Sequence, residues 1–371
     1  AGALNNGSVE DLAARLGVGD RYLRKLFLRE LGVSPLAIAQ HQRLEMAHSL
    51  LTGTNLPLTE VAFASGFGSI RRFNSAIRER YGTTPGRLRQ YPASRDHQEI
   101  RLQLQYRPPY DWEGVLDFFR RHAVAGMEQV DDDSYRRHLR FPEGQAQVTV
   151  RPQSGRHALD LALRLPAREQ LMPVVAMVRR MFDLDANPAV IADTLSADPA
   201  LADLLARTPG IRSPCHAVPF ESAVRAIVGQ QVSVAAARTV LGRLVEACHD
   251  GPPPRTFPSA AALATLPDDC FAMPRRRRDR LRALCSRFAG REHELDHDTL
   301  AGIPGVGPWT LSLVLMRGLG SPDEFPAGDL GLVKAWQSLG GIREGDARIP
   351  RAAWRPWGSY AANLLWRSLS Q

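Results

Sequence analysis

A glycine-rich turn and a single carboxylate are the residues of this chain best suited to chemistry. The turn lies within Ile303–Thr310, and Asp329 follows further along the chain. Because Gly305 and Gly307 leave the backbone bare, the N–H groups of the turn and of a helix starting near Trp309 can meet a phosphate oxygen. The pattern predicts an anion-binding turn with an acidic group behind it. Taken alone, such a turn could equally be a loop between two core helices.

The segments around the turn supply the elements that would hold Asp329 in place. An apolar helix is predicted over 311–319, and a Pro-containing loop leads from it to Asp329. Together the turn, the helix, the loop and the acid resemble the helix-hairpin-helix signature of the DNA glycosylase superfamily. The resemblance implies that Asp329 is catalytic and that Gly305 and Gly307 bind the DNA backbone.

The resemblance implies cleavage of an N-glycosidic bond, and Asp329 suits that reaction. Positive charge develops on the sugar when this bond breaks, so a carboxylate near C1′ stabilises the oxocarbenium-like state and can orient or deprotonate water. A base alkylated at a ring nitrogen already carries positive charge and leaves without a general acid. This fits a site with one evident carboxylate, and the resemblance implies alkylated bases of the 3-methyladenine and 7-methylguanine type as substrates.

The missing lysine in the turn argues against a second activity. Superfamily members that also cut the DNA strand use a lysine amine as nucleophile, where this chain has Trp309. The sequence holds no lysine between Lys25 and Lys334. We therefore expect a monofunctional DNA-3-methyladenine glycosylase without lyase activity. An enzyme for oxidised or mismatched bases is disfavoured by the same missing lysine and by the lack of iron-sulfur cysteines.

Electron-rich aromatic faces hold a cationic base well, and three aromatic residues are candidates for the base pocket. They are Trp309, Trp366 and Phe118, of which Phe118 is placed there by a resemblance to the amino-terminal domain of bacterial alkylbase glycosylases. Phe119 is expected in the core. Leu313 departs from the family pattern, because a well-known relative has tyrosine there, so the detailed substrate range does not transfer.

Two adjacent glutamines interrupt a single apolar helix predicted over 219–246. In the resembled family this position carries the side chain that wedges into the duplex where the damaged nucleotide rotates out. Gln231, with Gln230 beside it, is therefore the expected DNA wedge. A glutamine can fill the gap and hydrogen-bond the orphaned partner base. The alternative is that both glutamines cap a helix kink or face solvent.

A run of arginines opens a predicted helix before the turn, where it would either contact phosphates or simply be solvated. These residues are Arg275, Arg276, Arg277 and Arg278. Hairpins of the resembled type commonly hold a cation through backbone carbonyls, which here would be those of Ala301, Ile303 and Val306. A structural Na+, K+ or Mg2+ is thus an expectation at the hairpin, while no cofactor is expected to be required.

Residues 1–95 carry a helix-turn-helix pattern twice, fifty residues apart, with Arg21 matching Arg71 and Gly32 matching Gly82. The side chains that could reach phosphates or base edges are Arg21, Arg24, Lys25, Ser69, Arg71, Arg72 and Asn74. This segment has thirteen Arg and Lys against seven Asp and Glu, so it holds +6 of the net charge of +8. The repeat resembles the double helix-turn-helix domain of AraC-type regulators of the adaptive alkylation response. The alternative is a helical domain whose basic residues only solvate its surface.

Residues 96–210 follow a predicted linker at 91–94 and are expected to form a small α+β domain. Alternating residues predict strands at 100–106, 135–141, 145–151 and 157–165, and apolar periodicity predicts helices at 112–122 and 171–182. An antiparallel sheet with helices on one face would bury these elements. Apart from Phe118, the segment supplies no residue with an expected role in chemistry.

Composition limits the class of protein further. The basic balance, with a pI near 9.8, fits a polyanionic partner. The four cysteines lack metal-site spacing and indicate buried free thiols. No apolar run approaches the roughly 18 residues of a membrane span, and the first residues show no signal-peptide pattern. We expect a monomeric, cytoplasmic bacterial protein that binds double-stranded DNA and no membrane.

These observations predict a mostly α, multidomain protein. We expect an AraC-type double helix-turn-helix at 1–95, an α+β amino-terminal domain of a glycosylase at 96–210 and an all-α helix-hairpin-helix core at 211–371. The expected function is excision of alkylated bases in base excision repair, fused to a regulatory DNA-binding domain. The alternative is a transcription regulator whose glycosylase-like half only senses or bends DNA.

Overall fold

The computed structural model describes residues 9–15, 18–54, 56–89, 99–340 and 349–369. The chain divides into two compact units, of which the first combines 1–103, 141–148 and 160–176, and the second combines 104–140, 149–159 and 177–371. The predicted linker at 91–94 lies outside the described residues, and the domain boundaries after residues 95 and 210 stay predictions. No described helix has the length and apolar character needed to cross a membrane.

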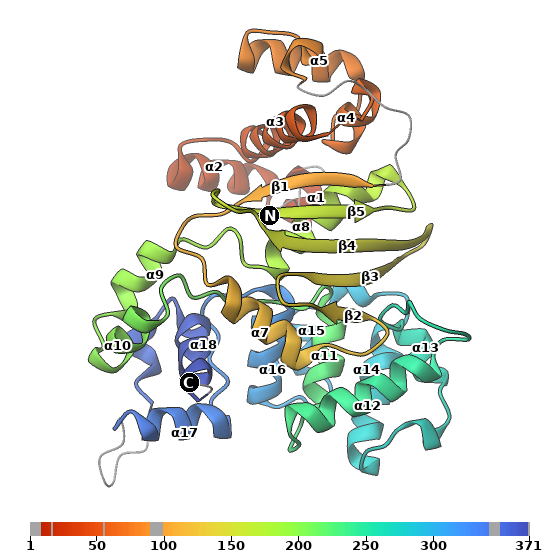
Figure 1. Cartoon of the computed structure of the whole chain (residues 1–371), viewed down its shortest axis with the longest axis vertical. Helices are drawn as coiled ribbons and strands as arrows, with labels where there is room; N and C mark the ends of the chain where they lie inside the picture. The colour runs from red at the N-terminus through yellow and green to blue at the C-terminus, as the bar shows by residue number, and fades with distance from the viewer. Residues whose placement is uncertain (1–8, 16–17, 55, 90–98, 341–348, 370–371) are drawn as a thin grey trace. The chain divides into compact units, whose positions relative to one another are not determined.

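The first unit contains both predicted helix-turn-helix copies (Figure 1). Its helices are α1 Val9–Arg15, α2 Asp20–Leu31, α3 Pro35–Gly53, α4 Leu58–Ala64, α5 Ile70–Tyr81 and α6 Pro85–Leu88. Helices α2 and α5 end at Gly32 and Gly82, which have φ values of 70° and 65°. Glycine adopts this left-handed conformation without strain. The sequence repeat is therefore confirmed, because matched glycines end matched helices.

Five strands form one antiparallel sheet in the order β1-β5-β4-β3-β2. The strands are β1 Ile100–Gln105, β2 Glu128–Val130, β3 Tyr135–Phe141, β4 Gly144–Pro152 and β5 Ala158–Arg164. Ile100, Leu102 and Leu104 of β1 are buried while the residues between them are exposed, as the alternating sequence predicts. All four predicted strands are confirmed. The sequence did not reveal β2, because three residues are too few to show a period.

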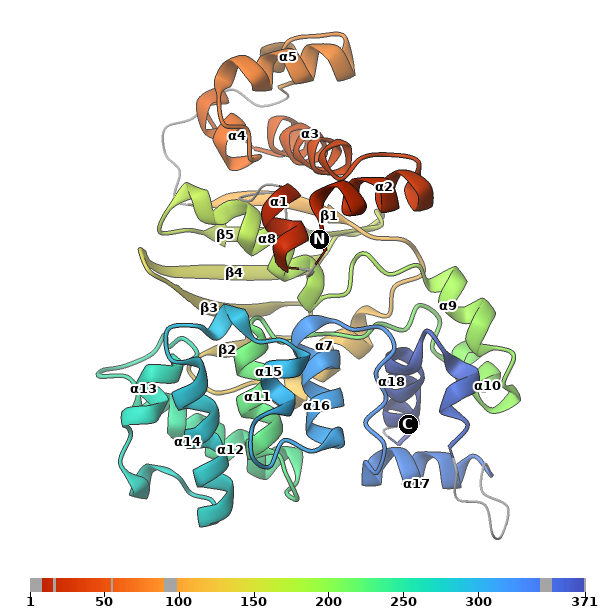
Figure 2. The same ribbon diagram turned by 180° about the vertical axis from the view of Figure 1, so that it is seen from behind.

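Two groups of helices make up most of the second unit, and they lie side by side in both views (Figures 1 and 2). The first group is α11 Pro219–Val228, α12 Val234–Ala247, α13 Ala260–Thr265, α14 Arg275–Phe288, α15 His297–Ala301 and α16 Pro308–Val314. The second group is α9 Pro188–Leu195, α10 Pro199–Arg207, α17 Leu330–Ser338 and α18 Gly358–Ser368. Each group buries its own apolar core, around Leu284 in the first and Leu365 in the second.

The remaining helices are α7 Trp112–His122, α8 Leu171–Met181, a π-helical turn Leu315–Leu319 and short 3₁₀ turns at Arg168–Gln170, Asp268–Cys270, Glu292–Glu294 and Arg351–Trp354. Helices α7 and α8 confirm the two helices predicted beside the sheet. Phe119 of α7 is buried, as expected for a core residue. The cysteines are free thiols, but only Cys215 and Cys285 are fully buried.

Two predicted helices differ from the structure, and both departures fall near the candidate site. The single helix predicted over 219–246 is wrong: α11 ends at Val228, and α12 begins after Ser233, whose side chain accepts a hydrogen bond from the Ala236 N–H at 3.2 Å. Between them Gln231 has a φ of 57°, which no helix residue adopts. The helix predicted over 311–319 changes into the π-helical turn after Val314.

Candidate active site

Helices α15 and α16 and the turn between them form the predicted hairpin. Helix α15 begins with a capping box, in which Asp296 and Thr299 exchange hydrogen bonds. Gly305 has a φ of 83°, and a Cβ atom placed on it would lie 2.1 Å from Arg280 Nε. The left-handed conformation favours glycine at this turn, and a side chain here would also displace the Arg280 side chain that crosses it.

Asp329 caps the N-terminus of α17 and is partly buried. Its Oδ1 accepts from the backbone N–H groups of Gly331 at 2.9 Å and Leu332 at 3.1 Å, and from Trp366 Nε1 at 3.0 Å. Its Oδ2 accepts from Trp309 Nε1 at 3.1 Å. Two helix-turn amides and two indoles therefore orient the carboxylate, and three separate segments of the chain meet at it.

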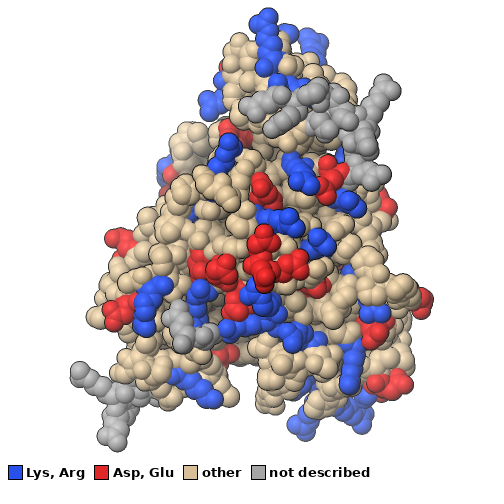
Figure 3. Space-filling model, viewed as in Figure 1, with Lys and Arg blue, Asp and Glu red and all other residues tan. Residues whose placement is uncertain are grey.

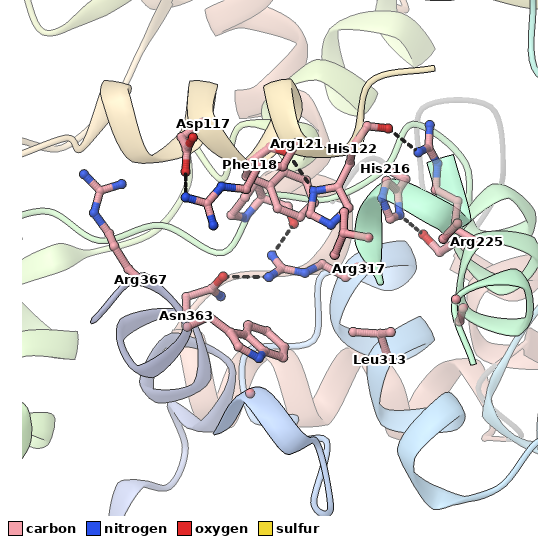
Figure 4. A pocket seen from close by; sticks show the side chains of 18 of the residues that line it. Asp117, Phe118, Arg121, His122, His216, Arg225, Leu313, Arg317, Asn363 and Arg367 are labelled. Atoms are coloured by element: carbon pink, nitrogen blue, oxygen red, sulfur yellow. Dashed lines mark hydrogen bonds and ion pairs between the residues drawn. The ribbon is translucent and has the colours of Figure 1, made fainter. Parts of the chain in front are cut away.

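Asp329 lines a cavity of about 510 Å³ in the second unit. Trp309, Trp366 and Phe118 line the same cavity, so the structure brings the predicted catalytic residue and all three predicted base-pocket residues together. The walls come from both helix groups, since Leu313 belongs to α16 and Trp366 to α18. Figure 4 shows the Arg317 side chain between Phe118 and Asn363, with Leu313 to the right of them.

Arg317 is a residue of this cavity that the sequence did not reveal (Figure 4). It is 5% exposed, and its Cζ lies 4.4 Å from the centre of the Phe118 ring and 5.4 Å from that of Trp366. Its guanidinium donates to Pro214 O at 2.8 Å and to Asn363 Oδ1 at 2.7 Å. Burial lowers the pKa of Arg317 to about 10, which leaves it positively charged at neutral pH. The π-helical turn places this side chain, and no sequence motif marks it.

Two histidines line the cavity beside Phe118 (Figure 4). His122 Nδ1 donates to Phe118 O at 2.7 Å, and the two rings lie 4.4 Å apart. His216 Nδ1 is 2.8 Å from Ser222 Oγ. Burial lowers the pKa of His122 to about 4 and that of His216 well below its usual range, so both rings are neutral at neutral pH. Neither histidine belongs to a recognisable sequence motif.

A buried ion network supports this wall of the cavity from behind. Glu221 of α11 pairs with Arg137 at 3.0 Å and with Arg225 at 2.7 Å, and Arg225 pairs with Glu128 at 2.8 Å. Arg225 also donates to the carbonyl of His122 at 2.7 Å. The network therefore fixes the C-terminal end of α7, which carries Phe118 and His122, against α11.

The break between α11 and α12, residues 229–233, which we name the wedge loop, contains both predicted wedge glutamines. Gln231 is exposed at the tip, whereas Gln230 points inward and hydrogen-bonds to Thr310, Gly305 and Arg280. Val232 of the loop lines the cavity. The structure therefore separates the two glutamines, because the Gln231 side chain is exposed and the Gln230 side chain is hydrogen-bonded within the protein.

The four arginines at the start of α14 do not share one environment. Arg275 and Arg276 are exposed, with 85% of the Arg275 side chain accessible. Arg277 lies 3.5 Å from Val228 O, and Arg278 pairs with Asp268 at 2.9 Å. In Figure 3, basic side chains gather at the lower edge of the part that carries α12 and α14. Arg275 and Arg276 are thus the members of the run that are available to a phosphate.

The predicted contacts of the helix-turn-helix unit are mostly exposed. These are Arg21, Arg24, Lys25, Arg71 and Arg72, while Asn74 is partly buried. Ser69 caps α5 by accepting from the Arg72 N–H at 3.3 Å, which gives it a structural role. Arg24 pairs with Glu10 at 2.8 Å. The structure leaves the other basic side chains on the surface of α2 and α5.

One of the hairpin carbonyls named for a structural cation is hydrogen-bonded within the hairpin. Ile303 O accepts from the Val306 N–H at 3.1 Å, which occupies one of its two lone pairs. The described residues hold no group of three or more His, Cys, Asp or Glu side chains that could bind a metal. A cation at the hairpin would therefore depend on the backbone oxygens of Ala301, Ile303 and Val306.

Comparison with known proteins defines the class. Three family models match in order: a helix-turn-helix domain over residues 12–91, an AlkA N-terminal domain over 101–217, and an HhH-GPD superfamily base excision DNA repair protein over 224–359. Among solved structures, the 3-methyladenine DNA-glycosylase from Archaeoglobus fulgidus matches with a TM-score of 0.61 at 21% identity, over 72% of this chain and 97% of that one. The fold is that of the helix-hairpin-helix glycosylases.

Sequence relatives define the family within that class. The chain is 41% identical over 389 aligned positions to the probable bifunctional transcriptional activator/DNA repair enzyme AlkA of Mycobacterium tuberculosis, covering 99% of this chain and 78% of that protein. It is 33% identical over 280 positions to DNA-3-methyladenine glycosylase 2 of Escherichia coli K12, covering 71% and 95%. The chain belongs to the AlkA family, as a fusion of a helix-turn-helix regulator with a 3-methyladenine DNA glycosylase. This confirms the predicted family and supports the enzyme over the alternative of a regulator that only senses or bends DNA.

Proposed function

We propose that the chain removes alkylated purines such as 3-methyladenine and 7-methylguanine from double-stranded DNA by N-glycosidic hydrolysis, and that it does not cut the DNA strand. One observation carries the proposal: the carboxylate of Asp329 stands on the cavity wall, where it is held by the indole N–H groups of Trp309 and Trp366. A flipped nucleotide whose base enters this cavity would bring its C1′ atom toward that carboxylate.

The contacts of Asp329 suit it to stabilise positive charge on the sugar. All four of its partners donate N–H groups, and the N-terminus of α17 adds a favourable dipole. Oδ1 accepts three hydrogen bonds and Oδ2 accepts one, so Oδ2 keeps a lone-pair direction for the sugar or for water. A negative charge fixed in this way stabilises an oxocarbenium-like transition state without first having to reorganise.

Two other carboxylates line the cavity, and both are already paired. Asp117 lies 2.8 Å from Arg121, and Asp111 lies 3.2 Å from Arg367 while it also caps α7. Their ion pairs support a mechanism in which the base leaves because its own positive charge makes it a good leaving group. Asp111 is the natural control in mutagenesis, since asparagine also caps a helix.

The absence of an amine at the cavity supports a monofunctional enzyme. Trp309 occupies the hairpin position at which a lysine would form a Schiff base. Lys334 is exposed on α17 and does not line the cavity. Lys25 belongs to the helix-turn-helix unit. Water activated beside Asp329 is therefore the proposed nucleophile.

The surrounding residues are proposed to hold DNA. The N–H groups of Gly305 and Gly307 bind a phosphate, with open space at Gly307 and the Arg280 side chain beside Gly305. Gln231 fills the duplex after the base has left it, and Arg275 and Arg276 bind the backbone electrostatically. The exposed basic side chains of α2 and α5 form a second DNA-binding surface. A monomer and a structural cation at the hairpin remain our expectations.

The test uses duplex DNA methylated with dimethyl sulfate. The wild-type chain is expected to release 3-methyladenine and 7-methylguanine, measured by chromatography, and to leave strands that break only after alkali treatment. Asp111→Asn should keep most of this release, and Asp329→Asn should lose it. Absence of release by the wild type would contradict the glycosylase, whereas strand breaks without alkali, or a covalent adduct trapped by borohydride, would contradict only the monofunctional mechanism.

A further inference from the structure

Gln230 joins three elements that must act together on DNA. Its Nε2 donates to Thr310 Oγ1 at 3.0 Å and to Gly305 O at 3.3 Å, and its Oε1 accepts from Arg280 Nη1 at 2.8 Å. The amide thus bonds at both ends, to the hairpin on one side and to α14 on the other. Thr310 is 3% exposed, whereas Gln230 and Arg280 are partly exposed, so the contact is anchored on a buried hydroxyl at the edge of the protein.

The wedge loop needs such an anchor because its backbone is strained. Gln231 has a φ of 57°, and a left-handed conformation costs a residue with a Cβ atom about 1 kcal/mol or more. The loop between Gly229 and Ser233 is held locally by two long turn bonds, from the Gln230 N–H to Ile227 O at 3.3 Å and from the Val232 N–H to Gly229 O at 3.4 Å. Contacts from outside the loop therefore add to the support of Gln231 in this conformation.

Helix α14 supplies part of that support with its arginines. Arg280 crosses the hairpin at Gly305, where a Cβ atom would lie 2.1 Å from its Nε, and reaches Gln230 from there. One turn earlier, Arg277 lies 3.5 Å from Val228 O at the end of α11. Two arginines on one face of α14 thus reach the start of the wedge loop. From its charge alone, this helix would be expected to bind phosphates instead.

We propose that Gln230, Arg280 and Thr310 form a latch that fixes the wedge loop to the hairpin, so that Gln231 and the phosphate-binding turn keep one spacing along the DNA. The proposal rests on the wedge and hairpin roles proposed above. In it Gln230 and Arg280 are positioning residues, which act through Gln231 and touch neither the sugar nor the base. Without the latch, the loop relaxes and Gln231 no longer fills the gap that the flipped nucleotide leaves.

The latch predicts coupling between Arg280 and Gln231. Affinity is measured for a duplex with a tetrahydrofuran abasic analogue and for the matched intact duplex. Arg280→Ala should weaken binding to the abasic duplex about tenfold more than to the intact one, since a hydrogen bond from a charged group is lost. Arg280→Lys, which can still donate to Gln230, should recover part of the preference. In a Gln231→Ala background, Arg280→Ala should have no further effect on the preference.

A direct phosphate contact by Arg280 would give the opposite pattern. Binding to both duplexes would then weaken equally, the loss would add to that of Gln231→Ala, and the dependence of affinity on salt would become shallower. The exposed Arg276→Ala serves as the control that should show this phosphate pattern. If Arg280 behaves as Arg276 does, the latch is overturned.

A second variant tests the latch without changing charge. Thr310→Val keeps the shape of the side chain and removes the Oγ1 acceptor, so it should lower the preference for the abasic duplex in the same direction as Arg280→Ala, with melting temperature as the check on folding. An unchanged preference in a folded Thr310→Val protein counts against the latch. If Gln231→Ala alone leaves the preference intact, the wedge fails and the latch with it, while release of methylated bases still reports separately on Asp329.

Discussion

Asp329 and Arg317 line the same cavity with opposite charges, and neutral groups stabilise each of them. Asp329 accepts hydrogen bonds from backbone and indole N–H groups, whereas Arg317 donates to the oxygens of Pro214 and Asn363. Trp366 contacts both, since its Nε1 donates to Asp329 and its ring faces Arg317. The two groups differ in their remaining capacity to bind a ligand. Asp329 keeps a free lone-pair direction, whereas aromatic rings lie over the Arg317 guanidinium.

This difference supports our proposal that the charge of Asp329 is catalytic and that of Arg317 is structural. A charge paired with its opposite would be neutralised, while a charge surrounded by dipoles keeps its field. We therefore propose that the field of Asp329 acts on the sugar. Arg317 instead lies on the cavity wall near the Phe118 and Trp366 rings. In our proposal, a cationic base is held by the remaining aromatic surface and by the nearby carboxylate.

The largest effect is expected at Asp329. Asp329→Asn removes the negative charge but retains an oxygen that can cap α17, so folding should be preserved. Single-turnover release of 7-methylguanine should fall by about a hundredfold to a thousandfold, the range for removal of one preorganised electrostatic group. Wild-type rates of base release in the asparagine variant would contradict a catalytic role for the Asp329 charge.

Arg317→Met should act on stability. It leaves Pro214 O and Asn363 Oδ1 without their donor in a buried place, which costs about 2 to 4 kcal/mol of unfolding free energy. Urea unfolding checks the value, with the exposed Arg276→Met as the matched control. If Arg317→Met is stable but its base release falls as far as that of Asp329→Asn, then Arg317 is catalytic. That result would contradict the division into a catalytic Asp329 and a structural Arg317.

Trp366→Phe separates the two contacts of the shared indole. The variant loses the hydrogen bond to Asp329 and keeps an aromatic face for Arg317. Base release should fall about tenfold, because one hydrogen bond to a charged group is lost, and stability should change less than in Arg317→Met. If release is unaffected, the indole N–H is not needed to orient the carboxylate.

The smallest effect concerns His122 and appears only in acid. Burial lowers the pKa of His122 from 6.5 to about 4, so between these values the unfolded chain binds more protons than the folded one. Stability is therefore lost as the pH falls through this range, by about 1 kcal/mol between pH 7 and pH 5.5 from this group. His122→Phe should lose correspondingly less over that interval in urea titrations. A wild-type and a variant curve that stay parallel would contradict the neutral, buried histidine.

Site roles could be predicted from the sequence where the residues belong to one local motif. They could not be predicted where residues from distant segments meet only in the folded chain. The turn at Gly305, Trp309 and Asp329 fall within one motif, and their contacts follow from it. The helix ends at Gly32 and Gly82 could also be predicted, because a helix end depends on residues that are neighbours in the sequence. The sequence does contain local signals for the break at the wedge loop, namely Gly229 and the helix-capping Ser233. The apolar period on both sides of them nevertheless favoured the prediction of one continuous helix.

Arg317 shows why the rest of the site was not predictable. Its neighbours Phe118, Pro214 and Asn363 come from three distant segments of the chain. Arg317 also lies in a π-helical turn, so the α-helical period cannot be used to predict which face its side chain occupies. The same holds for Gln230 and Arg280, which are fifty residues apart. Charge counting cannot distinguish such arginines from those that bind DNA.

The most direct test of the account is equilibrium binding to a mimic of the charged sugar. A duplex with a cationic pyrrolidine abasic analogue is compared with the same duplex carrying neutral tetrahydrofuran, for the wild type and for Asp329→Asn. If Asp329 stabilises positive charge at C1′, the wild type should prefer the cationic duplex by more than about a hundredfold, and the asparagine variant should lose that preference. An equal preference in both proteins would contradict the role of Asp329.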